Sequence, residues 1–204
     1  VPTPMYENLN KLSKMGYSLD MISDKMIGES KLENQKIQVS KDGSAYQVLI
    51  VPELTYLPES TLKNIIDLAQ NGASIIFQNE PKEVNGNFER DRRRTELKSL
   101  WNQIQFQNQT GNLKMASFGK GKIVVSSDVA KALEYLKIER EKLTDTGLKF
   151  VRRQFDGGKY YYIVNHTSKE INQNIPLNFT GKQVTLMNPE NGDYGLAETQ
   201  NNSV

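Results

Sequence analysis

The stretch Tyr46–Phe77 reads YQVLIVPELTYLPESTLKNIIDLAQNGASIIF, and it decides the fold. Four consecutive apolar β-formers occupy 48–51. An unbroken run of this kind predicts a strand that is buried on both faces, as in a parallel sheet. Pro52 ends the run because proline has no N–H to donate to a neighbouring strand. A second apolar run, at 75–77, predicts another buried strand.

The residues between these two runs predict a helix. Pro58 is tolerated in a first helical turn, and Glu59 stands close to the positive end of the helix dipole. Gly72 supplies the left-handed stop. One face carries apolar side chains at helical spacing, namely Leu62, Ile65, Ile66 and Ala69. A strand, a helix and a strand in this order form a βαβ unit, whose crossover is expected to be right-handed.

The same alternation extends on both sides of this unit. We expect helices over 6–15 and 92–106, a strand at 18–23, a buried strand at 123–125, and a helix that Asp128 caps. These elements predict an α/β domain over residues 1–138. From residue 139 onward, short β-runs follow one another without helices, which predicts an antiparallel β extension or partial β-sandwich over 139–204. These runs lie at 149–155, 160–164, 174–178 and 182–187.

The composition of the chain argues against several classes of function. The 26 basic and 24 acidic residues give a net charge of +2, too balanced to predict a nucleic-acid partner. The chain has no cysteine, which excludes disulfides and cysteine nucleophiles. His166 is the single histidine, so no two-histidine metal motif is possible, and its turn position favours a surface role. No apolar run approaches the roughly 20 residues of a membrane span.

Three polar side chains are the candidate ligand-binding residues. Glu53 and Tyr56 follow the first predicted strand, and Glu80 follows the second. Ligands of open α/β sheets bind at the carboxyl ends of the strands, and two carboxylates there could perform acid–base work on a sugar. The residue types are more typical of solvated loops or of contacts with a neighbouring domain.

Cofactor binding is not predicted. A binding site for the phosphate groups of a nucleotide or flavin needs a glycine-rich turn between a strand and a helix. The segments that follow the two predicted strands, 52–56 and 78–81, have no such turn. Gly119-Lys120-Gly121 precedes a strand rather than a helix, which is the wrong order for a phosphate loop. We therefore expect no cofactor and no metal, although a redox domain that binds a yellow chromophore remains an alternative hypothesis.

The aromatic residues allow a second interpretation. Tyr160-Tyr161-Tyr162 could form a platform for sugar rings, although such a run more often packs a strand with alternate rings exposed. Trp101 could also take part, but its helical spacing places it toward a core.

Several segments, in order along nearly the whole chain, resemble α-L-rhamnosidase-type glycoside hydrolases of family 106. They are 4–7, 14–24, 46–58, 119–128, 147–153, 160–165 and 188–192. The resemblance implies a flavodoxin-like open sheet, mostly parallel, with helices on both faces, which resembles glutamine amidotransferase domains and leads into an antiparallel β segment. It also implies a secreted or periplasmic bacterial enzyme. The relatives carry one more strand before this region, so its absence would leave a sheet edge open.

The resemblance implies that the catalytic carboxylates lie upstream, on a barrel that this chain does not contain. No catalytic residue is therefore carried over, and an amidotransferase would need the cysteine that is missing. The leading hypothesis is a non-catalytic accessory domain that acts through packing against other domains of its parent enzyme or through homo-oligomerisation. The alternative is a carbohydrate-binding module that uses exposed tyrosines.

Overall fold

The computed structural model describes residues 4–41, 43–109, 111–155, 157–179, 183–199 and 203–204. By their contacts, the residues fall into two compact units. The sheet unit is Asp20–Ile138 together with the first residues up to Met5, and the hairpin unit is Tyr6–Leu19 together with Glu139–Val204. The division into two domains at residues 138 and 139 stays a prediction.

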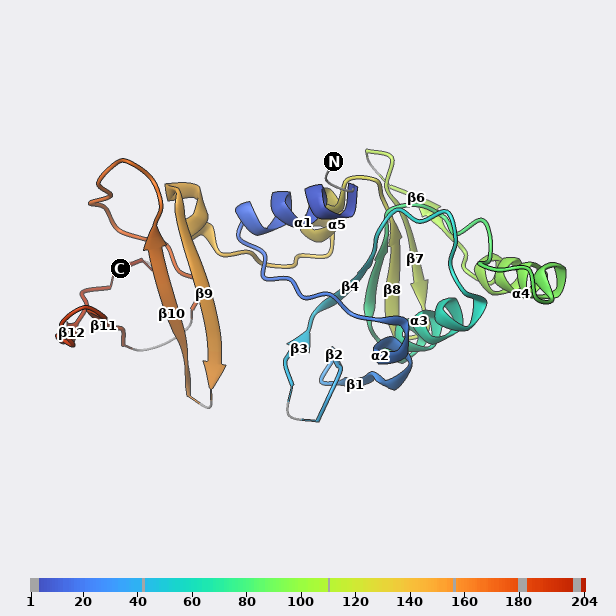
Figure 1. The fold of residues 1–204 in the computed structure, drawn as a ribbon, viewed down its shortest axis with the longest axis horizontal. Coiled ribbons are helices and arrows are strands. Elements are labelled where there is room, and N and C mark those ends of the chain that lie inside the picture. Colours follow the sequence, from blue (N-terminus) through green and yellow to red (C-terminus); the bar gives the residue numbers. More distant parts are fainter. Residues whose placement is uncertain (1–3, 42, 110, 156, 180–182, 200–202) are drawn as a thin grey trace. The chain divides into compact units, whose positions relative to one another are not determined.

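The sheet unit is built on a five-stranded mixed sheet (Figure 1). Its strands, in spatial order, are β4 (Val48–Val51), β5 (Ser74–Phe77), β8 (Gly121–Val125), β7 (Lys114–Phe118) and β6 (Gln107–Asn108). The first three are parallel, whereas β7 and β6 are antiparallel to their neighbours. The helix α3 (Glu59–Asn71) makes the crossover between β4 and β5, as the sequence predicts.

The prediction of a mostly parallel, flavodoxin-like sheet is wrong. Only three strands run parallel, and the other sheets of the described residues are small and antiparallel. The cause lies at Gly119–Gly121, where the chain reverses directly from β7 into β8. A parallel connection needs a crossover of a dozen or more residues, and none is available between these two strands.

The reversal depends on two glycines that pass close to the end of α3. A Cβ atom at Gly121 would lie 2.3 Å from the carbonyl oxygens of both Ala69 and Ala73, and one at Gly119 would lie 2.3 Å from the carbonyl oxygen of Gln70. Gly119 also has a φ of +58°. A side chain at either position would therefore push the β-turn away from the helix.

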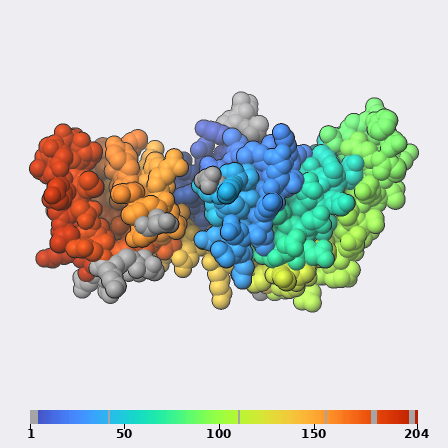
Figure 2. All heavy atoms as spheres, turned by 90° about the horizontal axis from the view of Figure 1, so that it is seen from below, coloured from blue at the N-terminus to red at the C-terminus, as the bar shows by residue number. Residues whose placement is uncertain are grey.

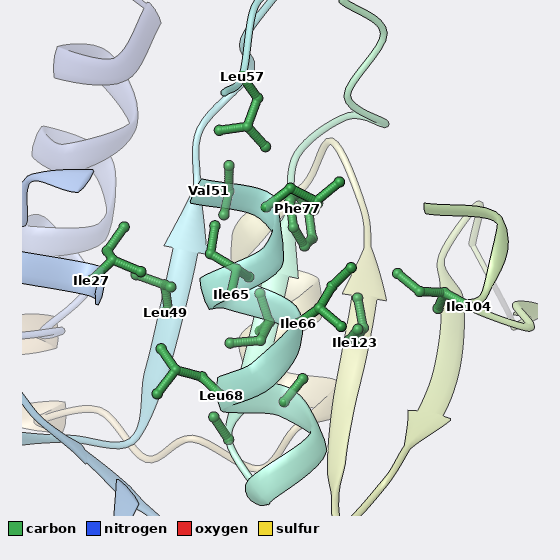
Figure 3. Close-up of a cluster of buried hydrophobic side chains, with 14 of the residues drawn as sticks. Ile27, Leu49, Val51, Leu57, Ile65, Ile66, Leu68, Phe77, Ile104 and Ile123 are labelled. Atoms are coloured by element: carbon green, nitrogen blue, oxygen red, sulfur yellow. The ribbon is translucent and has the colours of Figure 1, made fainter. Parts of the chain in front are cut away.

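The core of this unit lies between α3 and one face of the sheet (Figure 3). Ile65 and Ile66 of α3 face the strands, and Phe77 of β5 is 1% exposed. Trp101 lies edge-on to Phe77, with ring centroids 5.0 Å apart. Trp101 comes from α4 (Arg90–Asn102) and is half-buried, so its predicted position toward the core is confirmed.

Smaller elements complete the sheet unit. The helix α2 (Asp24–Glu29) contributes buried Ile27 to the core, and α5 (Val129–Tyr135) begins at Asp128, whose side chain accepts a hydrogen bond from the Lys131 N–H as predicted. A three-stranded antiparallel sheet contains β1 (Lys31–Glu33), β2 (Lys36–Gln38) and β3 (Ala45–Tyr46).

The hairpin unit consists of short pieces. It contains most of α1 (Pro4–Lys14), the 3₁₀ turn η1 (Lys142–Thr146), and two antiparallel pairs. The first pair is β9 (Leu148–Phe155) with β10 (Gly158–Asn165), and the second is β11 (Thr185–Met187) with β12 (Tyr194–Leu196).

Two strands expected from the sequence are absent from the described residues. The segments 18–23 and 174–178 form no strand, apart from an isolated bridge at Pro176. Both segments contain β-formers, but strand formation needs a neighbouring strand that supplies the hydrogen bonds. Local propensity alone therefore misled the prediction.

Candidate functional site

The ends of β4 and β5 are held together by two amide side chains. The Gln78 backbone N–H donates to the Val51 carbonyl at 3.0 Å, and its side-chain oxygen accepts from the Glu53 N–H at 3.3 Å. Asn79 exchanges two hydrogen bonds with the backbone of Leu54, at 3.1 and 3.0 Å. These two amides fix the loops at the predicted ligand-binding edge. This role was not predicted, because an amide that follows a strand has no distinctive sequence spacing.

Each of the three candidate ligand-binding residues has its own, separate surroundings. Glu53 is exposed, and Tyr56 is 55% exposed and forms a β-bridge with Glu83. The Glu80 carboxylate forms an ion pair with Lys114, with 2.8 Å between Oε1 and Nζ. Across the described part of the chain, no hydrogen bond or ion pair joins any two of the three candidates. A shared ligand at these residues stays a prediction.

The strand order provides no switch-point crevice at this edge, although Tyr56 lines a small hollow of about 250 Å³ together with residues 84–87 and Arg90. Ligand clefts of open α/β sheets form where the strand order reverses, so that neighbouring loops splay apart. The parallel strands β4, β5 and β8 follow one another in a single direction. Within the described ranges, no group of three or more carboxylate or histidine side chains could hold a metal ion.

The arginine-rich start of α4 is neutralised by carboxylates. Arg93 donates to both oxygens of Glu59 at 3.0 Å, and the two side chains are only 16% and 15% exposed. The hydrogen bond from Arg93 lowers the pKa of Glu59 below its ordinary value, against the opposing effect of desolvation. Arg93 also donates to the Asn85 carbonyl at 2.8 Å, so it anchors the loop before α4 to the start of α3.

The neighbouring arginines are paired in the same way. Glu83 accepts from Arg90 at 3.1 Å and lies 3.0 Å from Arg94, and Arg92 bonds Glu96 at 3.2 Å. The hydrogen bond from the Val84 N–H is the main cause that lowers the pKa of Glu83. The arginines are therefore part of a set of ion pairs at the start of a helix, rather than a basic patch for nucleic acid.

A buried carboxylate organises the hairpin unit. Glu141 is 0% exposed, and its Oε1 accepts from Arg152 and from the Tyr161 hydroxyl, the latter at 2.8 Å. Its Oε2 accepts from the Asn178 N–H at 2.8 Å. Both oxygens are therefore satisfied, which is the condition for a stable buried charge. This role suits a structural clamp rather than a reactive acid.

Tyr161 is part of the same clamp, because its hydroxyl donates to Glu141. Burial raises the pKa of its hydroxyl well above the ordinary value, and the hydrogen bond to Glu141 raises it further. A tyrosine of this kind stays protonated and donates. Glu141 was not predicted, because one glutamate in a polar stretch gives no sequence pattern. Two of its partners, Arg152 and Tyr161, become neighbours when β9 and β10 pair.

The tyrosines beside Tyr161 point the other way. Tyr160 is 61% and Tyr162 is 58% exposed, and Tyr160 stacks on Phe155 with ring centroids 4.5 Å apart. In the β9–β10 register, Tyr162 lies opposite Val151, which is 58% exposed. One face of the hairpin thus carries the clamp, and the other carries exposed apolar side chains. His166 lies in the exposed turn that follows β10.

Comparisons with known proteins agree on one class, the glycoside hydrolases. The model of the glycoside hydrolase 106 family, described as alpha-L-rhamnosidase, matches residues 1–199. The "Putative beta-glucuronidase" of Formosa agariphila is 24% identical over 184 residues, which cover 90% of this chain and 15% of that protein. The structure of a rhamnosidase from Novosphingobium sp. PP1Y matches with a TM-score of 0.69 and 24% identity, over 86% of this chain and 17% of that one.

The chain belongs to the alpha-L-rhamnosidase family of glycoside hydrolases. It corresponds to a small part of the larger relatives, about a sixth of their length. The resemblance inferred from the sequence is thereby confirmed. In the described residues, no helix is both long and apolar enough to cross a membrane.

Proposed function

We propose that this chain is a non-catalytic domain of a larger carbohydrate-degrading enzyme and that it works by packing against other domains of that enzyme. The observation that carries the proposal is the β11–β12 ribbon, which is apolar and exposed on both faces. Met187, Tyr194 and Leu196 lie on one face and are 69–79% exposed, while Leu186 on the opposite face is 56% exposed. A two-stranded ribbon is marginally stable in water and needs a packing partner.

The fate of the carboxylates supports the non-catalytic part of the proposal. A glycosidase needs two carboxyl groups that flank the scissile bond. Glu59, Glu83 and Glu141 are each bound to arginine, and Glu80 is bound to lysine. The Glu59–Arg93 and Glu141–Arg152 pairs are largely buried and join separate segments of the chain, which suits a structural role, whereas the Glu80–Lys114 pair is exposed.

The first experiment measures glycosidase activity. The purified 204-residue chain is incubated with 4-nitrophenyl α-L-rhamnopyranoside, and no nitrophenol above the buffer rate is expected. Release that persists through purification and is lost in a Glu53→Gln or Glu80→Gln variant would overturn the proposal and would favour chemistry at the strand ends.

The second experiment tests packing in a longer family enzyme that contains this domain. Met187→Ser with Leu196→Ser should lower the Tm of the whole enzyme and leave the KM of the remaining activity unchanged. The matched control is Phe88→Ser in the sheet unit, a side chain that is 79% exposed and precedes α4. An unchanged Tm in the double variant would contradict packing at this ribbon.

A second candidate function is carbohydrate binding by exposed tyrosines. The stacked pair of Tyr160 and Phe155 favours it, because sugar rings bind flat aromatic faces. Oligosaccharide binding that disappears in Tyr160→Ala and Tyr162→Ala variants would support this second function.

A further inference from the structure

A polar hollow opens in the sheet unit between α2, the β1–β2 turn and α3. Its volume is about 500 Å³. Small-molecule sites usually measure about 300–1,000 Å³, so the hollow is large enough for one or two sugar rings. In Figure 2 the blue surface of the β1–β2 region adjoins the blue-green surface of α3. The hollow is distinct from the strand ends and from the exposed tyrosines.

The hollow combines an apolar floor with an amide-rich rim. Ile27 and Leu68 are 7% and 6% exposed and belong to the core, so they give the floor a fixed shape. Asn34, Gln35 and Asn64 contribute carboxamide groups to the lining. A carboxamide both donates and accepts hydrogen bonds, as a sugar hydroxyl does, and the apolar floor suits the C–H face of a sugar ring.

Asn64 lines the hollow, and its side-chain amide is available to a ligand. It lies on α3 and is half-buried, and no residue in the described ranges forms a hydrogen bond with its side-chain amide. Gly28 of α2 faces it, and a Cβ atom there would lie 2.9 Å from the Asn64 amide nitrogen. Glycine at this position therefore keeps the amide uncovered.

The β1–β2 turn projects the other two amides. Asn34 and Gln35 both have positive φ, 50° and 62°, as a tight two-residue hairpin turn of this type requires. Such a conformation costs energy for a residue other than glycine, although asparagine tolerates it better than most. The tight turn fixes where the two amides stand at the rim of the hollow.

The charges of the lining favour a neutral ligand. Lys31 and Asp67 are its only ionisable side chains and have opposite signs. The two charges offset each other, so the lining has no net attraction for a phosphate or a uronate, and it lacks the arginines that usually bind such anions.

We propose that this hollow binds a neutral sugar, with the Asn64 amide as its central hydrogen-bonding group. The inference is independent of the packing proposal, which concerns the hairpin unit. A deoxy sugar such as L-rhamnose fits the chemistry, because its methyl group and ring C–H bonds can lie on the apolar floor while its hydroxyls meet the amides.

The test is an NMR titration of the ¹⁵N-labelled 204-residue chain with L-rhamnose, with inorganic phosphate titrated separately. We expect millimolar binding, since a ligand of this size makes few contacts, with shifts confined to the backbone amides of 27–35 and 64–71. Asn64→Ala should weaken binding at least tenfold, and Gly28→Val should abolish it by filling the hollow. Asn102→Ala, an exposed asparagine at the end of α4, is the matched control and should bind as the parent chain does.

Each other outcome overturns the inference. Shifts at the amides of Tyr160 and Tyr162 would move binding to the hairpin unit, and equal shifts with phosphate would exclude selection for a neutral ligand. Binding that survives in Asn64→Ala would remove the proposed central group. In a longer family enzyme, strong protection of 27–35 and 64–71 from hydrogen exchange without sugar would show that another domain fills the hollow. Well-dispersed spectra of the variants confirm that they fold.

Discussion

The sheet unit and the hairpin unit are stabilised in different ways. The sheet unit has a closed apolar core in which Leu62, Ile75 and Ile123 are fully buried. The hairpin unit is organised around one buried charge, Glu141, and leaves Leu186 and Tyr194 exposed. An apolar core stabilises without regard to direction, whereas a buried charge stabilises only when every partner is in place.

This contrast bears on the proposed packing role of the chain. The sheet unit buries most of its large apolar side chains within its own core, although Phe88 and Met21 are exposed. The hairpin unit leaves many large apolar side chains exposed, and this supports the proposal that it packs against other domains of a larger enzyme.

The substitution with the largest expected effect disrupts the core of the sheet unit. Phe77→Ala should lower the free energy of unfolding by about 3–5 kcal/mol, because it removes a ring that is 1% exposed and contacts Trp101. Urea titration followed by the fluorescence of Trp101, the single tryptophan, measures this unit. Phe88→Ala is the control, and it should change the value by less than about 0.5 kcal/mol. Equal losses in the two variants would refute the assignment of the core.

The next effect breaks the clamp of the hairpin unit. Glu141→Gln keeps the shape of the side chain but removes the charge that Arg152 faces, and it should destabilise the hairpin unit by about 2–3 kcal/mol. Tyrosine near-UV circular dichroism should report this loss, while the Trp101 transition stays in place. Arg153→Gln on the opposite face is the control, since the described residues offer that exposed arginine no ion pair. A wild-type signal in Glu141→Gln would mean that the clamp contributes nothing.

The sequence predicts the sheet unit well at the level of local elements. Four apolar residues before Pro52, the stop at Gly72 and the cap at Asp128 each act on their immediate neighbours, so a short window of sequence contains the whole cause. The antiparallel direction of β7 also has a local cause, because the short connection at Gly119–Gly121 leaves no room for a parallel crossover. The mostly parallel sheet was predicted from the family resemblance instead, and that prediction was wrong.

The candidate sites were harder to predict than these local elements. Glu53, Tyr56 and Glu80 were chosen because they follow strands, but sequence position does not show that Lys114 lies beside Glu80. Glu141 and Asn64 have no motif at all, and each acquires its environment from an element elsewhere in the chain. Ion pairing and concavity arise from tertiary structure, which periodicity does not encode.

A smaller effect tests the ion pair at the edge of the sheet unit. The pKa of Glu59 is lowered in the folded chain, mainly by the hydrogen bond from Arg93. Its stabilisation is therefore complete above the ordinary glutamate pKa of about 4.3 and is lost as the pH falls through the lower folded value. Glu59→Gln should cost about 1 kcal/mol at pH 6. The difference from the parent chain in urea titrations should shrink as the pH approaches about 3, and a constant difference would contradict the ionic origin.

The smallest effect on stability is expected for a substitution at Tyr194. This substitution tests whether the faces of the β11–β12 ribbon are exposed to solvent. Tyr194→Ser should change the free energy of unfolding by less than about 0.5 kcal/mol, because the side chain is 79% exposed. It should nevertheless reduce concentration-dependent association in sedimentation velocity, since exposed aromatic side chains drive contacts between molecules. Met21→Ser, which removes a side chain 73% exposed in the sheet unit, should leave association unchanged. A loss of more than about 1 kcal/mol in Tyr194→Ser would mean that the ribbon packs within the chain, and the contrast between the two units would disappear.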